Sequence, residues 1–309
     1  MTSTASLSKL RLGTAPDSWG VWFPDEPQQV PWHRFLDEAA AAGYTLIELG
    51  PYGYLPTDPE QLRDELGRRG LTLTGGAVFA GLHRGAEAYE QALVDYRQEA
   101  ALLSALGARH VIALPEQYTD MRGGDVLEAS RLEPEQWRAL TDGYSRLGRV
   151  VQEEFGLQLD FHSHADSHVG TQEQIERFLD DTDPSTVSLC LDTGHVAYYG
   201  GDNEAIVRKH PERIGYVHLK QVDPVVVEQV HREGLSFADA VRRGAMVEPP
   251  NGVPDMPPLL DALAALDAEI FTIVEQDMYP CPPDAPLPIA ERTARYLGGC
   301  GLGPVRGRP

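Results

Sequence analysis

The sequence predicts an α/β protein with one domain, residues 1–309, folded as an eight-stranded (β/α)8 (TIM) barrel. Short apolar segments rich in β-branched and aromatic residues alternate with segments of helical periodicity. Several of these apolar segments end in ionisable side chains, as expected where parallel strands open onto an active site. The chain has 309 residues, 42% of them hydrophobic, which is enough for one large core.

The expected strands are short and apolar, and most are followed by a helical pattern. They cover residues 10–15, 45–50, 71–79, 110–116, 157–164, 187–192, 214–220 and 270–275. The expected helices begin at capping signals such as Asp58-Pro59 and the Thr171–Gln174 capping box, and the first ends at Gly43. They cover residues 32–42, 59–70, 86–106, 134–155, a segment after Thr171, 203–210, 236–243, 257–266 and 288–297.

A doubly wound open sheet is the competing architecture. Such a sheet is expected to carry a glycine-rich turn after its first strand, and Gly13-Thr-Ala-Pro-Asp-Ser lacks that pattern. The segment at about 223–255 is the longest interruption of the strand–helix alternation. We expect it to lie over the C-terminal face of the barrel, where it could act as a lid.

Charge and composition exclude several classes of function. The net charge is −21, and the 26 Lys+Arg residues form no basic stripe, so nucleic acid is not an expected partner. Three cysteines form no paired framework, which favours the reducing cytoplasm. No apolar run approaches the roughly 20 residues of a membrane span, and residues 1–9 lack the apolar core of a secretion signal. We therefore expect a cytoplasmic protein without membrane contact.

Polar residues gather at the ends of the expected strands. Because side chains alternate between the two faces of a strand, those at 160, 162 and 164 share one face, as do those at 216, 218 and 220. The strand-end residues are Glu48, Glu116, His162, His164, Asp192, His218, Lys220 and Glu275. Converging buried carboxylates repel one another and lose hydration, and a divalent cation would resolve both costs. Histidine and carboxylate ligands without thiolate suit Mn²⁺, Co²⁺, Zn²⁺ or Mg²⁺.

Each of these residues also has an ordinary structural interpretation. Any one of them could be a hydrogen-bonded buried polar group, and Lys220 could be an ion-pair partner of Asp192 or Glu275. Trp19 and Trp22 could pack at the rim rather than form a wall for a ligand. A serine hydrolase is not supported, because no Gly-x-Ser-x-Gly turn is present.

Several motifs resemble the xylose-isomerase-like barrel superfamily of sugar phosphate isomerases and epimerases, and most closely its inosose dehydratase branch. They include Phe161-His-Ser-His164, Leu191-Asp-Thr-Gly-His195, Val217-His-Leu-Lys220 and Ile273-Val-Glu-Gln-Asp277. The resemblance implies one divalent metal, Mn²⁺ or Co²⁺ in the first place, bound by Asp192, His218 and Glu275. Where many members have a strand-five glutamate, this chain has His162, the expected fourth ligand; His164 or Glu116 could replace it. Endonuclease relatives of the superfamily match poorly.

The resemblance implies a metal-dependent dehydratase, a lyase that acts on an inosose-like polyol ketone through an enolate. His164, His195 and Lys220 are the expected proton-transfer or oxyanion-binding groups. The expected substrate contacts are Glu48, Glu116, His168, Trp19 and Phe79. The alternatives are a sugar isomerase or ketose 3-epimerase, and a non-catalytic sugar-binding or partner subunit. A sugar or cyclitol is the expected ligand, and we expect a homo-oligomer.

Overall fold

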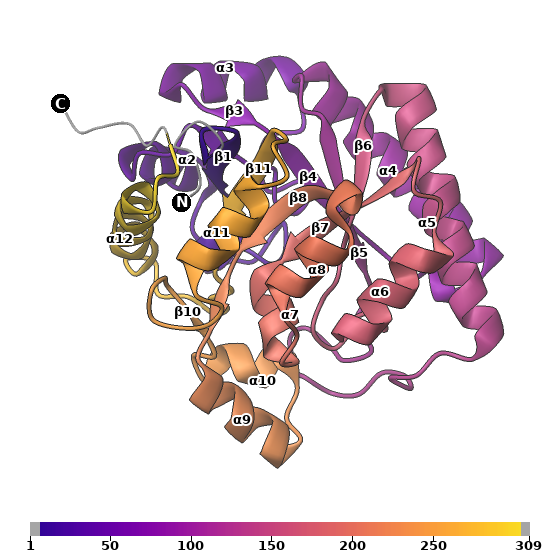
Figure 1. The fold of residues 1–309 in the computed structure, drawn as a ribbon. Helices are drawn as coiled ribbons and strands as arrows, with labels where there is room; N and C mark the ends of the chain where they lie inside the picture. The colour runs from indigo at the N-terminus through magenta and orange to yellow at the C-terminus, as the bar shows by residue number, and fades with distance from the viewer. Residues whose placement is uncertain (1–6, 304–309) are drawn as a thin grey trace.

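The computed structural model describes residues 7–303 and places a parallel β-sheet at the centre, with helices packed around it (Figure 1). The sheet contains nine strands in the order β3-β2-β1-β11-β8-β7-β6-β5-β4. Their bounds are β1 Leu10–Thr14, β2 Leu46–Ile47, β3 Thr72–Leu73, β4 Gly75–Ala80, β5 His110–Pro115, β6 Gln158–His162, β7 Val187–Asp192, β8 Ile214–Leu219 and β11 Ile270–Val274. Every pairing in this sheet is parallel.

The third stave of the barrel is divided at Thr74. Its first part, β3, pairs with β2, and its second part, β4, pairs with β5. β3 and β4 therefore count as one bent strand that joins the two ends of the sheet, and the predicted (β/α)8 barrel is confirmed. The prediction of an uninterrupted strand at 71–79 was wrong, because this stretch forms two strands, β3 and β4, separated at Thr74.

Eleven α-helices lie within the described residues 7–303. They are α2 Trp32–Ala41, α3 Pro59–Arg69, α4 Ala86–Ala105, α5 Pro134–Phe155, α6 Gln172–Asp181, α7 Thr193–Tyr198, α8 Asn203–Lys209, α9 Pro224–Glu233, α10 Phe237–Arg242, α11 Met256–Ala264 and α12 Pro286–Gly299. The expected caps are present: Asp58 accepts a hydrogen bond from the Gln61 backbone N–H, and Thr171 and Gln174 form a capping box. The sequence analysis did not predict α7 or α9.

Two hydrophobic layers flank the strands. The outer layer lies between strands and helices, while a smaller cluster with Ile112, Leu114, Cys190, Tyr216 and Ile273 fills the barrel interior. The interior is thus closed below by apolar packing. The polar residues at the ends of the strands lie above this plug.

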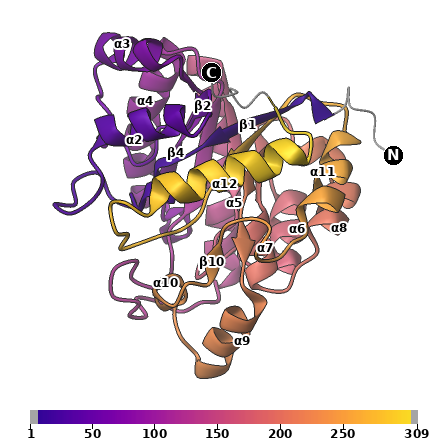
Figure 2. The same ribbon diagram turned by 90° about the vertical axis from the view of Figure 1, so that its left-hand side faces the viewer.

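The segment at about 223–255 contains α9, α10 and strand β10 (Met246–Val247), which pairs antiparallel with β9 (Gln221–Val222). α9 and α10 lie together at one end of the molecule (Figure 2). Phe237 at the start of α10 donates its backbone N–H to Asp166 in the loop after β6. Among residues 7–303, no helix combines the length and apolar character needed to cross a membrane.

Candidate active site

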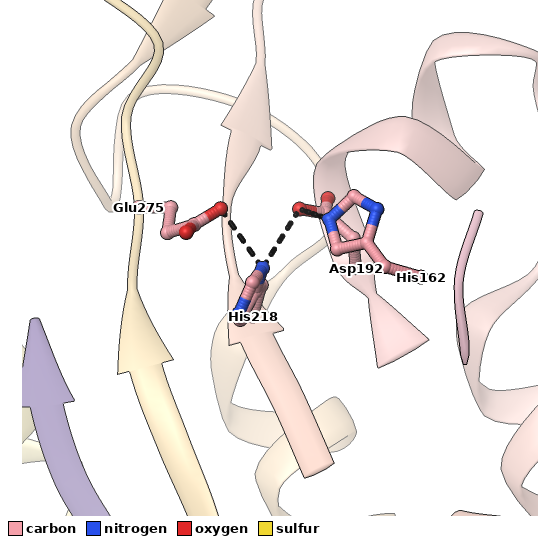
Figure 3. A group of neighbouring side chains, drawn as sticks. All are labelled: His162, Asp192, His218 and Glu275. Carbon is pink, nitrogen blue, oxygen red and sulfur yellow. Dashed lines mark hydrogen bonds and ion pairs between the residues drawn. The ribbon is translucent and has the colours of Figure 1, made fainter. Parts of the chain in front are cut away.

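Four potential metal ligands from neighbouring staves meet above the interior plug (Figure 3). They are His162 at the end of β6, Asp192 at the end of β7, His218 in β8 and Glu275 directly after β11. One ligand atom from each lies within 4.8 Å of all the others. His162 Nε2 is 3.1 Å from Asp192 Oδ2, and His218 Nδ1 is 2.8 Å from Glu275 Oε2 and 3.7 Å from Asp192 Oδ2.

The two ring nitrogens of His218 have different surroundings. Nε2 lies 2.7 Å from Glu48 Oε1, a distance at which Nε2–H donates to the carboxylate. Nδ1 is buried and faces the carboxylates of Glu275, at 2.8 Å, and Asp192, at 3.7 Å. Burial alone would lower the pKa of His218, but the charges of Cys190, Glu275 and Glu48 hold it well above its usual value. A metal-ligating imidazole usually donates one ring N–H to a carboxylate, as His218 Nε2 does to Glu48, so that the other ring nitrogen can bind the ion that the facing carboxylates also bind. The residues present therefore fit a divalent cation.

The charges around the cluster support the same conclusion. Asp277 is buried beside it and Asp17 is partly buried, and Lys220 Nζ lies 2.9 Å from Asp277 Oδ2 and 3.9 Å from Asp17 Oδ2. Burial raises the pKa of Asp17 well above its usual value, and the negative charge of Glu275 adds to this effect. Burial also raises the pKa of Asp277. The protein's own cations thus leave negative charge uncompensated, which favours an additional positive ion.

Lys220 is a buried ammonium group surrounded by carboxylates. Its Nζ lies 3.1 Å from both Asp192 Oδ2 and Glu275 Oε2. Burial alone would lower the pKa of Lys220, but the surrounding carboxylates, those of Asp192 and Asp277 most strongly, hold it well above its usual value. With its proton retained, Lys220 is suited to donate rather than to accept one.

His164 points a free ring nitrogen toward the cavity. Its Nδ1 lies 2.7 Å from the Ala165 carbonyl oxygen, so Nδ1–H is the donor and Nε2 holds the lone pair. Burial, together with the neighbouring His162, lowers the pKa of His164 to about 3. The imidazole is therefore neutral at physiological pH and can accept a proton.

His195, an expected proton-transfer group, lies behind the cavity wall. The ring is fully buried with its centroid 3.9 Å from that of His164, and its Nδ1 accepts the Ala165 backbone N–H. Nε2 lies 3.4 Å from Lys220 Nζ. Because α7 begins immediately after β7, His195 lies behind His164 and Lys220 instead of on the cavity wall. It can position these two groups, but it does not reach a substrate directly.

A cavity of about 590 Å³ opens beside the cluster. This volume is within the range of small-molecule sites and can hold a six-membered polyol ring. Trp22, Phe79 and Phe237 contribute apolar wall, and Glu48, Glu116 and Lys220 contribute polar groups. Of the expected substrate contacts, Glu48, Glu116 and Phe79 therefore line the cavity, although Glu48 is engaged by His218 and Glu116 by Arg84.

Trp19, another expected substrate contact, belongs to the core. Its ring packs edge-on against Phe35, and its Nε1–H donates to Glu38. The 3-10 turn Pro16–Trp19 ends at Gly20, whose positive φ of 74° reverses the chain. Trp22 therefore faces the cavity in place of Trp19, and it stacks on Tyr279 with ring centroids 4.9 Å apart.

His168 also lies off the cavity wall. It forms a second group with His83 and Glu128, in which His83 Nε2 and His168 Nε2 lie 3.0 and 3.4 Å from Glu128 Oε1. The same oxygen is 2.9 Å from Arg84 Nη2, so this carboxylate already has a cationic partner. The loop after β6 turns His168 toward this neighbouring network.

Three residues of the site, Asp17, Asp277 and Phe237, were not predicted from the sequence. Asp277 follows Glu275 by two residues, and the alternation of side chains could have indicated that the two lie together. Asp17 lies in the loop directly after β1, where strand-end residues of a barrel gather. Phe237 comes from α10 and left no comparable local signal.

Comparison with known proteins places the chain in a family. The model of the family described as "Xylose isomerase-like TIM barrel" matches residues 36–297. The chain is 32% identical over 301 residues to an inosose dehydratase of Geobacillus thermodenitrificans (strain NG80-2). This alignment covers 96% of this chain and 99% of the relative. It is 31% identical over 296 residues to an inosose dehydratase of Clostridium perfringens (strain 13 / Type A), at 94% and 97% coverage.

Solved structures show the same fold. The probable 3-DHS dehydratase AsbF of Bacillus anthracis superposes with a TM-score of 0.71 at 13% identity, covering 94% of this chain and 99% of that one. The IOLI protein with a bound zinc atom superposes with a TM-score of 0.69 at 17% identity, at 95% and 98% coverage. The resemblance inferred from the sequence motifs is thereby confirmed. This chain belongs to the xylose isomerase-like TIM barrel family.

Proposed function

We propose that this protein is a divalent-metal-dependent dehydratase acting on an inosose-like polyol ketone. The observation that carries the proposal is the cluster of His162, Asp192, His218 and Glu275, with Nδ1 of His218 directed at the two carboxylates and a cavity with polar groups beside it. Relatives named inosose dehydratase that align with nearly the whole chain support the reaction class. The zinc bound by a protein of the same fold supports the presence of a metal, which we propose to be Mn²⁺ or Co²⁺, with Zn²⁺ and Mg²⁺ as alternatives.

In this proposal His162, Asp192, His218 and Glu275 hold the cation. A divalent ion bound there supplies a Lewis acid that polarises the substrate ketone and makes the adjacent C–H bond more acidic. Glu48 fixes the tautomer and orientation of His218 by accepting its Nε2–H.

The proton transfers belong to His164 and Lys220. His164 Nε2 takes the proton from the carbon next to the ketone, since Ala165 holds the opposite N–H. The hydroxyl group on the following carbon leaves as its C–O bond breaks, and the Lys220 ammonium protonates it to water. A carbon–carbon double bond forms between the two carbons, and the resulting enol tautomerises to a second ketone. His195 keeps His164 and Lys220 in place.

Purified protein loaded in turn with Mn²⁺, Co²⁺, Zn²⁺ and Mg²⁺ should be incubated with inosose and with a panel of ketoses. Mass spectrometry should detect a product that has lost one water from inosose. An isomerised ketose that keeps its water would instead identify an isomerase or epimerase. Stoichiometric ligand binding without any turnover would identify a binding subunit.

We further propose that residues 1–309 form a single domain, with the segment at about 223–255 over the C-terminal face. Phe237, which belongs to this segment, lines the cavity, and this supports the proposed position of the segment. We also propose that the protein works in the cytoplasm as a homo-oligomer without nucleic acid or membrane partners. The acidic net charge of −21 and three free cysteines agree with this proposal, and size-exclusion chromatography with light scattering tests the oligomeric state.

A further inference from the structure

The barrel wall is incomplete between β2 and β4. The Leu49 N–H donates to the Gly75 carbonyl oxygen at 2.9 Å, but no strand pairing joins β2 to β4 beyond this point in the described residues. The cavity extends into the opening, where Gly50, Tyr52 and Val78 line it together with residues of the outer helix α4. A helix outside the barrel thereby contributes to the wall of the active-site cavity.

Glu99 is the residue of α4 that enters this opening. Its side chain is 2% exposed and lines the cavity. A Cβ atom added at Gly76 would lie 2.3 Å from Glu99 Oε1, so any other residue at 76 would occupy the space of the carboxyl group. The glycine in β4 thus allows a carboxyl group from outside the barrel to reach the cavity.

The carboxyl group of Glu99 is buried without a hydrogen-bond partner among the described residues. It makes no hydrogen bond with any residue between 7 and 303, and its Oε1 is fully buried. Burial, with a further contribution from the charge of Glu48, raises the pKa of Glu99 to about 8. At neutral pH Glu99 therefore carries a proton and offers an O–H donor for which residues 7–303 provide no acceptor. An unsatisfied buried polar group is unfavourable and calls for a function.

We propose that Glu99 is a specificity-determining residue that hydrogen-bonds a hydroxyl group of the substrate in the opening between β2 and β4. This inference rests on the proposed function in one respect, namely that the ligand is a polyol ring. Glu99 lies on the side of the cavity reached from α4, while the metal ligands come from β6, β7, β8 and the end of β11. A ring whose ketone faces the cation can thus direct another hydroxyl toward Glu99.

The test compares Glu99→Leu with the wild-type protein. Leucine fills a similar volume without a polar group, so thermal stability should be equal or higher. KM for inosose should rise about tenfold with kcat changed less than about threefold, since one ground-state hydrogen bond is lost. The Kd of myo-inositol, a cyclitol without a ketone, should rise by a similar factor in titration calorimetry. Metal content should not change.

Two further variants distinguish a binding role from a structural one. Gly76→Ala should displace the carboxyl group and raise KM as Glu99→Leu does, and it should add little in the Glu99→Leu background.

Glu99→Gln keeps a donor that cannot ionise. The wild-type KM should rise above pH 8 while that of Glu99→Gln stays flat. The ionisable groups around Glu99 are Glu48, on the β2 side, and Asp95 and Tyr96 on α4. Glu90→Gln, an exposed change on the same helix, is the matched control.

The outcomes separate this inference from the proposed function. If the wild-type protein fails to dehydrate inosose, the proposed reaction is wrong, but the cyclitol titrations still compare Glu99→Leu with wild type. Equal KM and equal cyclitol Kd in the two proteins would overturn the role of Glu99. Absence of cyclitol binding and of inosose turnover in the wild-type protein would overturn it as well.

Discussion

Glu48 and His218 face each other across the barrel, with Glu48 Oε1 2.7 Å from His218 Nε2. Glu48 follows β2 and His218 lies in β8, and β1 and β11 separate these strands in the sheet. The contact therefore exists only because the barrel closes. It directs Nδ1 of His218 toward Asp192 and Glu275. The orientation of one proposed metal ligand thus depends on a residue outside the ligand set.

Glu48→Gln should weaken metal binding while the four proposed ligands stay in place. A carboxamide accepts the His218 N–H less strongly, and loss of such a supporting group lowers metal affinity by about 10- to 100-fold. Competition with a chromogenic chelator measures this change. Glu65→Gln is the matched control, because Glu65 pairs with Arg68 and Arg69 on α3 and lies outside the cavity and the cluster. Equal affinities for the two variants would remove Glu48 from this role.

Asp192→Asn and His218→Ala should each lose bound metal and activity while keeping the fold. Both side chains lie within the four-residue cluster and both are buried. Elemental analysis of the purified variants measures the metal, and circular dichroism checks the fold. His33→Ala, an exposed histidine in α2, should retain full metal content. Full metal content in both cluster variants would count against the site.

His164→Ala should retain the metal and lose turnover. Removal of a general base typically lowers kcat by about 10²- to 10⁴-fold. Steady-state kinetics on the metal-loaded protein, with metal content measured in parallel, checks the expectation. Unchanged kcat would exclude His164 from proton transfer and direct attention to other groups of the cavity.

Glu99 should make folding stability depend on pH. Its pKa in the folded protein, about 8, exceeds the usual value of 4.5, so the folded state holds one more proton than the unfolded state between these values. The contribution is fully present below pH 4.5 and is lost as pH rises toward 8, by at most about 1.4 kcal/mol per pH unit. Glu99→Gln lacks this loss. The difference in melting temperature between Glu99→Gln and wild type should therefore grow from pH 5 to pH 8 in thermal scans, and a constant difference would contradict the raised pKa.

Local patterns were sufficient to predict the barrel and much of the candidate site. Strand alternation placed His162 with His164 on one face and His218 with Lys220 on one face, and the position of Glu48, Asp192 and Glu275 at strand ends indicated that they lie at one rim. The caps at Asp58 and Thr171 were also predicted, since a cap depends on a few neighbouring residues. These features follow from chain geometry within a single element.

The tertiary structure decided the features that depend on packing between distant elements. The turn at Gly20 sends Trp19 into the core and Trp22 to the cavity, and the first turn of α7 places His195 behind His164. Nothing in the local sequence distinguishes Glu99 from other residues of its helix. Its role depends on the packing of α4 over Gly76 at the opening between β2 and β4. Sequence periodicity determines which face of an element is buried, but the groups that this face meets are set by the closure of the barrel and by the packing of each helix against it.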